Sequence, residues 1–171
     1  LLPAADRALT WIEEYGDCDG DGYVEYRRRS DRGLVNQGWK DSWDAIRFAD
    51  GRLARAPIAL CEVQGYVYGA YLARAHFADE VGDEATAARY RSKAAALKTA
   101  FNRDFWLEDQ GWFAMGLDAD KKPIDALASN MGHCLWKGIV DQDKAGAVAD
   151  RLLSPEMFSG WGIRTLSSAM V

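Results

Sequence analysis

The sequence predicts an all-α fold of the α/α-toroid kind, with short β-hairpins in the loops that connect the helices. Two observations lead to this fold class. Long segments with helical spacing of apolar residues alternate between segments that are apolar on nearly all sides and segments that are amphipathic. The polar and aromatic residues that could carry chemistry lie in the connecting loops. Inner helices around an axis, outer helices on solvent and functional loops at one end satisfy both observations.

The first two segments are a helix and a long loop. Apolar residues recur at helical spacing over residues 4–15, and Gly16 is a natural stop. Residues 16–35 are rich in turn formers, and the alternation over residues 23–26 suggests a short strand or hairpin. The chain is therefore expected to enter its main helices only after this loop.

The next two segments form an inner and an outer helix. Residues 58–81 are apolar on nearly all sides, with Pro57 suited to the first turn and Gly82 to the end of a buried helix. Asp83 is a suitable N-cap for a second helix over residues 84–106, which carries Lys and Arg on one face.

The remaining segments repeat this order. Residues 107–123 predict a hairpin, residues 127–139 an inner helix and residues 141–153 an amphipathic outer helix. Residues 154–171 read as a Gly/aromatic loop that runs into a possible helix start. This is fewer than half the helices of a complete six-hairpin ring. Residues 1–171 are therefore expected to be part of a single (α/α)6-barrel domain that lacks its C-terminal portion.

Composition excludes several classes of protein. The chain has 171 residues, 49% hydrophobic and 27% charged, a formal charge of −5 and one short basic run at residues 27–32. These values are typical of one globular domain and argue against nucleic acid as a partner. No apolar run approaches the ~20 residues that a membrane helix needs. Three widely spaced cysteines form neither a disulfide ladder nor a zinc pattern, which suits a cytoplasmic location.

An acidic loop raises the question of calcium. Asp17, Asp19, Asp21 and Gly22 match the opening of a calcium-binding loop, but Arg28 stands where an EF-hand needs a glutamate. Two interpretations stay open at this stage. Glu25 could complete an unconventional oxygen cage for a structural calcium ion, or the Asp side chains form turns by accepting nearby backbone N–H groups. No cofactor is otherwise expected.

The stretch WKDSW places Asp41 between Trp39 and Trp43. A carboxylic acid that protonates a glycosidic oxygen needs a raised pKa, and aromatic walls raise it by excluding water. The two indole faces could also pack on the C–H side of a sugar ring. The alternative is that Asp41, or the better-suited Asp44, is only the N-cap of a helix over residues 42–50.

Further polar residues interrupt the apolar segments, where they must find partners. Each alone is more simply explained as a satisfied polar group in the core. Several at the same ends of inner helices favour a pocket lined by hydroxyl-binding groups. They are Glu62 and Gln64 in one inner helix, Asn130 and His133 in the other, and Arg164 after Trp161 in the closing loop.

Four runs together resemble a known family. NQGWKDSWD (36–44), PIALCEVQGYVYGA (57–70), SNMGHCLWKGI (129–139) and FSGWGIRTLSS (158–168) are similar to the catalytic toroid of amylo-α-1,6-glucosidase-type, glycogen-debranching-enzyme-like proteins. The loop 16–26 fits as well, so the resemblance covers essentially the whole chain. These proteins belong with the inverting glycosidases built on (α/α)6 barrels.

The resemblance implies that Asp41 is the general acid. It also implies sugar-contact roles for a set of residues in the same runs: Trp39, Lys40, Glu62, Gln64, Asn130, His133, Trp161 and Arg164. The implied partner is an oligosaccharide or glucoside substrate. Sequence does not select the linkage that is cleaved.

The resemblance places the general base on a glutamate downstream of the run GWGIRTL, and no candidate follows Arg164 in this chain. Inverting hydrolysis needs two carboxyl groups about 6.5–9.5 Å apart. The isolated chain is therefore expected to have little activity and to need the rest of its parent chain. An exposed apolar face on the 58–81 helix would favour oligomers. A non-catalytic carbohydrate-binding domain and a calcium-binding structural module are the competing interpretations.

Overall fold

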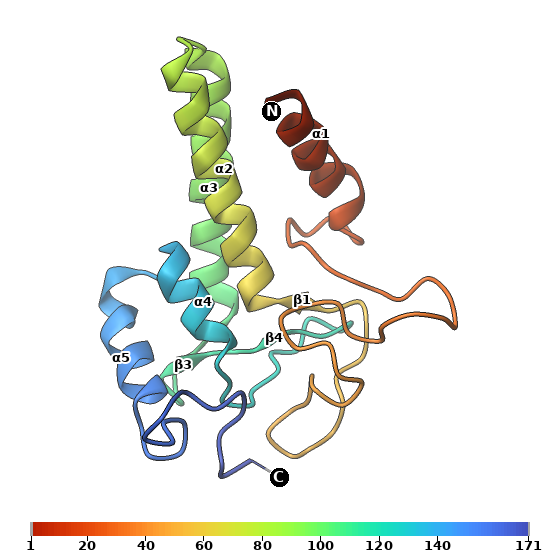
Figure 1. The fold of residues 1–171 in the computed structure, drawn as a ribbon, viewed down its shortest axis with the longest axis vertical. Coiled ribbons are helices and arrows are strands. Elements are labelled where there is room, and N and C mark those ends of the chain that lie inside the picture. The colour runs from red at the N-terminus through yellow and green to blue at the C-terminus, as the bar shows by residue number, and fades with distance from the viewer. Residues whose placement is uncertain (1, 171) are drawn as a thin grey trace.

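A computed structural model describes residues 2–170 and contains five α-helices within them (Figure 1). The helices are α1 (Leu2–Trp11), α2 (Cys61–Glu80), α3 (Glu84–Asp104), α4 (Asn130–Lys137) and α5 (Gln142–Leu152). One π-helical turn, Ile12–Gly16, continues α1. The predicted sequence of helices is confirmed, and α3, α4 and α5 lie where the periodicity places them. None of the helices within residues 2–170 has the length and apolar character to cross a membrane.

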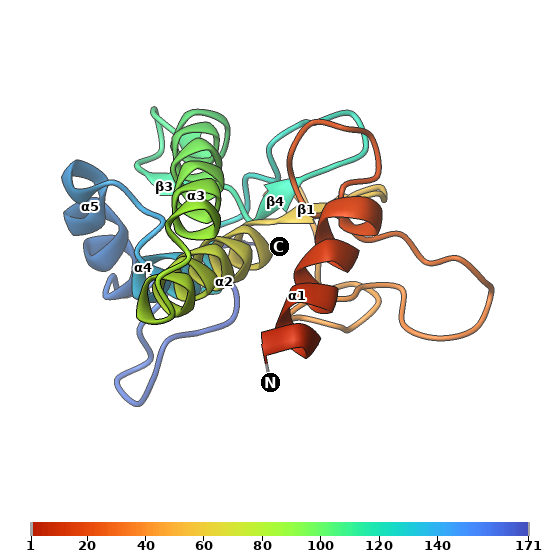
Figure 2. The same cartoon turned by 90° about the horizontal axis from the view of Figure 1, so that it is seen from above.

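The inner helix α2 packs against both α3 and α4, and α4 packs against α5. Three stacked aromatic rings belong to this core. The ring centroid of Phe101 lies 4.9 Å from that of Phe105 and 4.8 Å from that of Phe113. All three rings are essentially buried. Helix α1 stands apart from the α2–α3 pair in the ribbon (Figure 2). Two ion pairs connect this N-terminal segment to the pair of helices. Asp6 of α1 contacts Arg74 of α2, and Glu13 of the π-helical turn contacts Lys93 of α3.

The boundary between α2 and α3 forms as the sequence predicts. The Asp83 carboxylate accepts the N–H of Thr86 at 3.0 Å, which satisfies one free donor in the first turn of α3. Gly82 adopts φ 74°, the left-handed conformation that ends a helix at low cost for glycine. This short turn makes α2 and α3 antiparallel neighbours (Figure 1).

Two short antiparallel pairs occupy the connecting loops. Strand β2 (Trp106–Leu107) pairs with β3 (Trp112–Phe113), which confirms the hairpin predicted after α3. Strand β1 (Ala59–Leu60) pairs with β4 (Gly116–Leu117). The prediction that Pro57 opens α2 is wrong. Residues 59–60 are extended instead, and the N–H of Cys61 donates to the carbonyl of Met115 as the helix begins.

Three further sequence-based expectations are corrected. No strand pair forms within residues 16–35; Tyr26 instead bridges to Ile58. Residues 42–50 form turns rather than a helix, because backbone bonds join Phe48 to Arg52 and Ala54 to Ile46. No helix begins in the loop that follows α5 up to residue 170. Asp41 and Asp44 are therefore not helix N-caps.

The inner helices α2 and α4 both begin at the end of the molecule where the loops and short strands gather (Figure 1). Their first turns carry the polar residues singled out in the sequence, Glu62 and Asn130. Polar side chains from both inner helices therefore meet the connecting loops at this end of the fold.

Candidate functional site

A buried carboxylate lies at the centre of the loop end. Glu62 is fully buried in the first turn of α2. One of its oxygens accepts the backbone N–H of Trp39 at 3.3 Å, and the other accepts Nδ2 of Asn130 at 2.9 Å. Glu62 therefore joins both inner helices to the loop that carries Asp41. Its oxygens are used within the chain, so the structure gives it a role in positioning this loop.

Gly38 makes this approach possible. A Cβ atom built on Gly38 would lie 2.1 Å from Cδ1 of Leu60 and 3.1 Å from Oε1 of Glu62. Leu60 is fully buried and has little room to move. The glycine in the sequence Gln37–Gly38–Trp39 thus lets the backbone of the Asp41 loop lie directly against the start of α2.

Lys40 ties the same loop to the closing segment. Its Nζ donates to the backbone carbonyl of Thr165, which also accepts the N–H of Ser129 at 3.2 Å. Burial lowers the pKa of Lys40 to about 8, and the negative charge of Glu62 acts in the opposite direction. The ammonium faces inward to the backbone, so Lys40 holds two loops together.

Asp41 lines a cavity of about 350 Å³. The cavity is lined by Trp39, Lys40, Asp41, Ser42, Asp44, Ala45, Arg47, Thr165 and Leu166. Asp41 is exposed, and so are the rings of Trp39 and Trp43, which are 57% and 69% accessible. The expectation that the two indoles bury this carboxyl is therefore not met within residues 2–170. The carboxyl is placed beside a concavity all the same.

A second cavity of about 440 Å³ adjoins the first, and Trp39 and Thr165 line both. The imidazole of His133 lines the second cavity, with its ring centroid 5.0 Å from that of Trp39. Nδ1 of His133 lies 2.8 Å from the hydroxyl of Tyr66, on the next turn of α2 after Glu62. The structure thus brings Asp41, Trp39 and His133 to one connected surface.

The other predicted sugar contacts lie elsewhere. Gln64 is fully buried, and its amide accepts the N–H of Val24 and donates to the carbonyl of Val24 at 2.9 and 2.8 Å. Trp43 and Arg164 line neither of the two cavities, and the closing loop presents Trp161 at its tip, 99% accessible. Gln64 is therefore a structural residue that joins α2 to the segment directly after the acidic loop of Asp17, Asp19 and Asp21.

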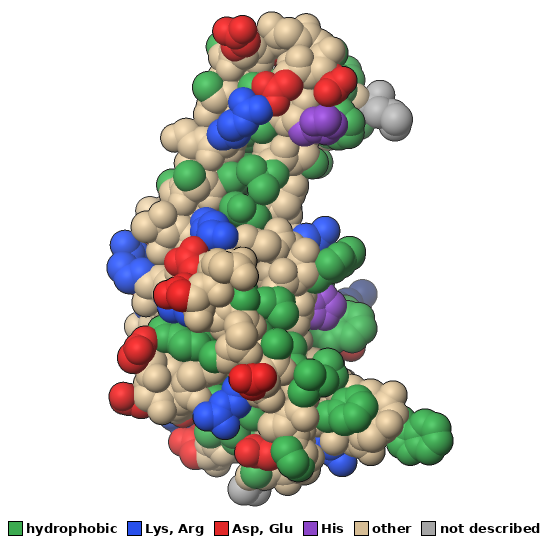
Figure 3. Space-filling model, turned by 90° about the vertical axis from the view of Figure 1, so that its left-hand side faces the viewer, with side chains coloured by type: hydrophobic (Ala, Val, Ile, Leu, Met, Phe, Trp, Pro, Cys, Tyr) green, Lys and Arg blue, Asp and Glu red, His purple; other side chains and the backbone are tan. Residues whose placement is uncertain are grey.

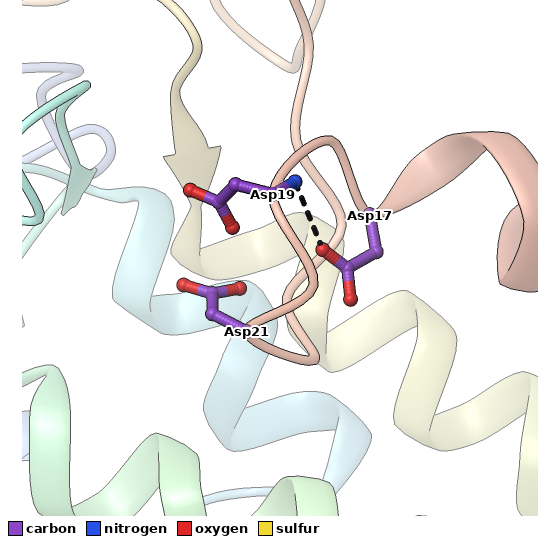
Figure 4. Close-up of side chains that lie close together, drawn as sticks. All are labelled: Asp17, Asp19 and Asp21. Atoms are coloured by element: carbon purple, nitrogen blue, oxygen red, sulfur yellow. Dashed lines mark hydrogen bonds between the residues drawn. The ribbon is translucent and has the colours of Figure 1, made fainter.

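The acidic loop comes together as the sequence predicts. One ligand oxygen from each of Asp17, Asp19 and Asp21 lies within 4.8 Å of the others (Figure 4). The Asp17 carboxylate accepts the backbone N–H groups of Asp19, Gly20 and Gly22, as in an Asx turn.

A lysine also reaches this loop. Nζ of Lys121 lies 2.9 Å from Asp19 and 2.6 Å from Asp21, and it contacts Glu25 as well. These contacts raise the pKa of Lys121, although burial opposes them. One ammonium group from the turn at residues 118–122 thus offsets part of the negative charge of this loop, and its contacts occupy carboxylate oxygens that a calcium ion would need, which favours the turn interpretation over the calcium cage.

Two residues of this surface were missed from sequence. Tyr66 follows Glu62 by four positions, which places both on one face of α2 and could have identified it. Thr165 lines both cavities, but nothing in its sequence context distinguishes it from Thr or Ser elsewhere in the chain. Its place depends on contacts with the loop at residues 36–44, which are distant in sequence.

The order of inner and outer helices is that of the α/α-toroid class of folds. The chain belongs to the Mannosylglycerate hydrolase MGH1-like glycoside hydrolase domain family, whose sequence model matches residues 3–169. A search of curated proteins gave no significant match.

Solved structures support the fold. A protein titled "Sialidase" superposes with a TM-score of 0.68 at 20% identity, over 97% of this chain and 14% of that one. Neutral trehalase Nth1 from Saccharomyces cerevisiae gives a TM-score of 0.62 at 15% identity, over 76% of this chain and 25% of that one. This chain therefore spans a quarter or less of the length of either neighbour. Similarity at this level of identity establishes the α/α architecture.

Proposed function

We propose that this chain is part of an inverting α-glucosidase, of the debranching or α-glucosidase type, in which Asp41 is the general acid. The observation that carries the proposal is the double anchoring of the Asp41 loop. The Glu62 carboxylate accepts the N–H of Trp39, two residues before Asp41. The backbone carbonyl of Thr165 accepts a hydrogen bond from Nζ of Lys40, the residue next to Asp41. A catalytic carboxyl must be held in place to meet a glycosidic oxygen, and these contacts fix its backbone.

In this mechanism Asp41 donates its proton to the glycosidic oxygen as the bond to the anomeric carbon breaks. A second carboxylate removes a proton from water, which attacks the opposite face of the sugar. A sugar ring seated in the cavity beside Trp39 would displace water from the Asp41 carboxyl. The bound substrate would thus shield the Asp41 carboxyl from water, which the exposed indoles of Trp39 and Trp43 do not do.

Glu62 is unsuited to the role of general base. Its two oxygens are taken by Trp39 and Asn130, and the side chain has no exposed surface from which to reach a water beside the sugar. We assign the base to another residue and, in line with the family resemblance, place it outside residues 1–171.

The test is Asp41→Asn in the full-length protein, with Asp50→Asn as a matched control. Asp50 is exposed and lines neither cavity. Loss of a general acid lowers kcat by roughly 10²–10⁴-fold while binding of the α-glucoside persists. Turnover by Asp41→Asn at the parental rate would remove Asp41 from the mechanism. A parent protein that binds sugars without hydrolysing any would identify a carbohydrate-binding domain instead.

The proposal includes a cytoplasmic location. Cys61 and Cys134 are free thiols buried in the core between α2 and α4, and such thiols persist in a reducing compartment. Fractionation of cells that express a tagged full-length protein tests this part, and recovery of the tag in the secreted fraction would contradict it.

A further inference from the structure

A third cavity, of about 530 Å³, shares no lining residue with the two cavities at Asp41 and His133. Its walls come from the end of α1 with the π-helical turn, from the segment 24–37 and from α2. None of the residues assigned to hydrolysis lines it. A cavity of this volume suits a small molecule.

Four arginines line this cavity, in a chain whose formal charge is −5. All four are exposed, and within residues 2–170 no carboxylate or other hydrogen-bonding group engages their guanidinium groups; they are Arg27, Arg28, Arg29 and Arg32. Six arginines elsewhere in these residues do contact a carboxylate. The basic loop reaches out at the right of Figure 1, whereas the opposite side of the molecule carries acidic and basic side chains intermixed (Figure 3). Unpaired positive charge is therefore concentrated at this cavity.

The acidic groups nearby do not offset this charge. Among the described residues, Glu25 is the one acidic residue in the lining, and its side chain is fully buried. Oε1 of Glu25 contacts Nζ of Lys121, and Oε2 accepts the backbone N–H of Cys18 at 3.2 Å. Asp31 belongs to the same basic loop but does not line the cavity. The guanidinium groups are therefore left for an anion from outside.

The two ends of the segment that carries the arginines are fixed. The backbone N–H of Tyr26 donates to the carbonyl of Ile58 at 3.1 Å, and the carbonyl of Tyr26 accepts the N–H of Ile58 at 3.0 Å. The hydroxyl of Tyr26 donates to Oδ1 of Asn36 at 2.7 Å, which joins the start of the segment to its end. The arginines thus stand on a closed loop, and a loop that is already closed loses less entropy when a ligand binds.

The thiol of Cys18 also lines this cavity and is exposed, whereas Cys61 and Cys134 are buried. Burial, the largest cause, raises the pKa of Cys18, while the positive charges of Arg27 and Arg29 act to lower it. These two guanidinium groups therefore lie close enough to act on the thiol, and Cys18 can report on what occupies the cavity.

We propose that this cavity binds a small anion with more than one negative charge, held by the guanidinium groups of the four arginines. The planar fork of arginine matches the oxygens of phosphate and carboxylate groups, which share this chemistry. The rings of Trp11 and Tyr15, with centroids 6.3 Å apart, supply a wall for an apolar part of the same ligand. This inference goes beyond the proposed function and does not depend on it.

Calorimetric titration of the full-length protein with pyrophosphate and with citrate tests the site. Tighter binding of pyrophosphate identifies phosphate chemistry, and tighter binding of citrate identifies carboxylate chemistry. Arg27→Gln/Arg29→Gln should raise Kd about tenfold, because two charge-assisted contacts to the anion are lost. The matched control is Arg7→Gln, since Arg7 is exposed on α1 outside the lining. It should change Kd by less than about twofold. Failure of both anions to bind at millimolar concentration overturns the site, as does a double variant with parental Kd.

Alkylation of Cys18 by iodoacetamide, a neutral reagent, locates the bound anion. Mass spectrometry of the peptide that contains Cys18 follows the reaction in the full-length protein. The anion should slow the modification of Cys18 in the parent and in Arg7→Gln, and should not slow it in Arg27→Gln/Arg29→Gln. Protection that persists in the double variant would place the anion elsewhere and overturn the assignment. Neither measurement involves hydrolysis of a glycoside, so the result for this site is separate from that for Asp41.

Discussion

Nδ2 of Asn130 donates to Oε2 of Glu62 across 2.9 Å, and this bond joins the first turns of the two inner helices inside the core. The other oxygen of Glu62 reaches the loop of Asp41 through the N–H of Trp39. The pair therefore couples the packing of α2 and α4 to the position of the proposed acid.

Glu62→Ala should destabilise the protein and disable the site together. It leaves the amide of Asn130 and the N–H of Trp39 without an acceptor, each at a cost of about 1–3 kcal/mol. Chemical denaturation and kcat measure the two effects. Glu80→Ala, at the exposed far end of α2, should stay within about 0.5 kcal/mol of the parent. Equal stability of the two variants would contradict the role given to Glu62.

Lys40 should impose a characteristic pH dependence on stability. Its folded pKa of about 8 lies below the ordinary value of 10.5, because burial disfavours the ammonium form. The unfolded chain then binds more protons between these two values, so this group makes folding more favourable as pH rises from about 8 to 10.5.

The slope of this dependence is at most about 1.4 kcal/mol per pH unit. Lys40→Met removes the titration, so the free energy of unfolding of the parent minus that of the variant should increase over this interval. Urea denaturation at several pH values measures it. A constant difference from pH 7 to pH 10.5 would mean that Lys40 titrates normally in the folded chain.

Lys121→Met should loosen the acidic loop, because it removes the ammonium group shared by Asp19, Asp21 and the buried Glu25. Loss of one partner of a fully buried ion pair costs about 3–5 kcal/mol, and the partial exposure of this one lowers the expected cost. Thermal melting should show a drop of several degrees, whereas Lys122→Met, whose Nζ contacts no carboxylate within residues 2–170, should melt like the parent.

The parent should melt at the same temperature with and without a chelator, because the ammonium of Lys121 already occupies the carboxylates of Asp19 and Asp21 that a calcium ion would need. A fall of the parent's melting temperature in the chelator would restore the calcium interpretation.

Two glycine substitutions should act in opposite directions. Gly38→Ala forces a Cβ against Leu60 and Glu62, and overpacking of this kind costs about 1–3 kcal/mol. It should also lower kcat by displacing the Asp41 loop. Gly146→Ala lies in α5 with open space around the new Cβ, and should stabilise the protein by about 0.5–1 kcal/mol. Denaturation of both variants checks the signs, and a neutral Gly38→Ala would contradict the close approach.

The sequence was sufficient for the features that depend on local chemistry. The N-cap at Asp83, the glycine stop at Gly82 and the spacing of apolar residues place α3 and the end of α2 correctly. The alternation of inner and outer helices is equally local. These features could be predicted because each is decided within a few residues.

The features that could not be predicted depend on distant partners. Residues 59–60 are extended because they pair with β4, and Tyr26 pairs with Ile58 rather than within its own loop. Lys121 reaches Glu25 across 96 residues of sequence. The turn-forming residues of the acidic loop do not indicate that a distant lysine contacts it. The spacing of residues 42–50 likewise does not predict the turn in which the N–H of Phe48 bonds to the carbonyl of Arg52.

Helices α2 and α4 have their N-termini close together, and this arrangement has an electrostatic consequence. Peptide dipoles add along each helix to roughly half a positive elementary charge at its N-terminus. Glu62 sits in the first turn of α2 and contacts the first residue of α4, so the positive poles of two helices converge on one buried carboxylate. This convergence offsets part of the cost of removing Glu62 from water, and it lets an acidic group anchor the loops without a guanidinium beside it.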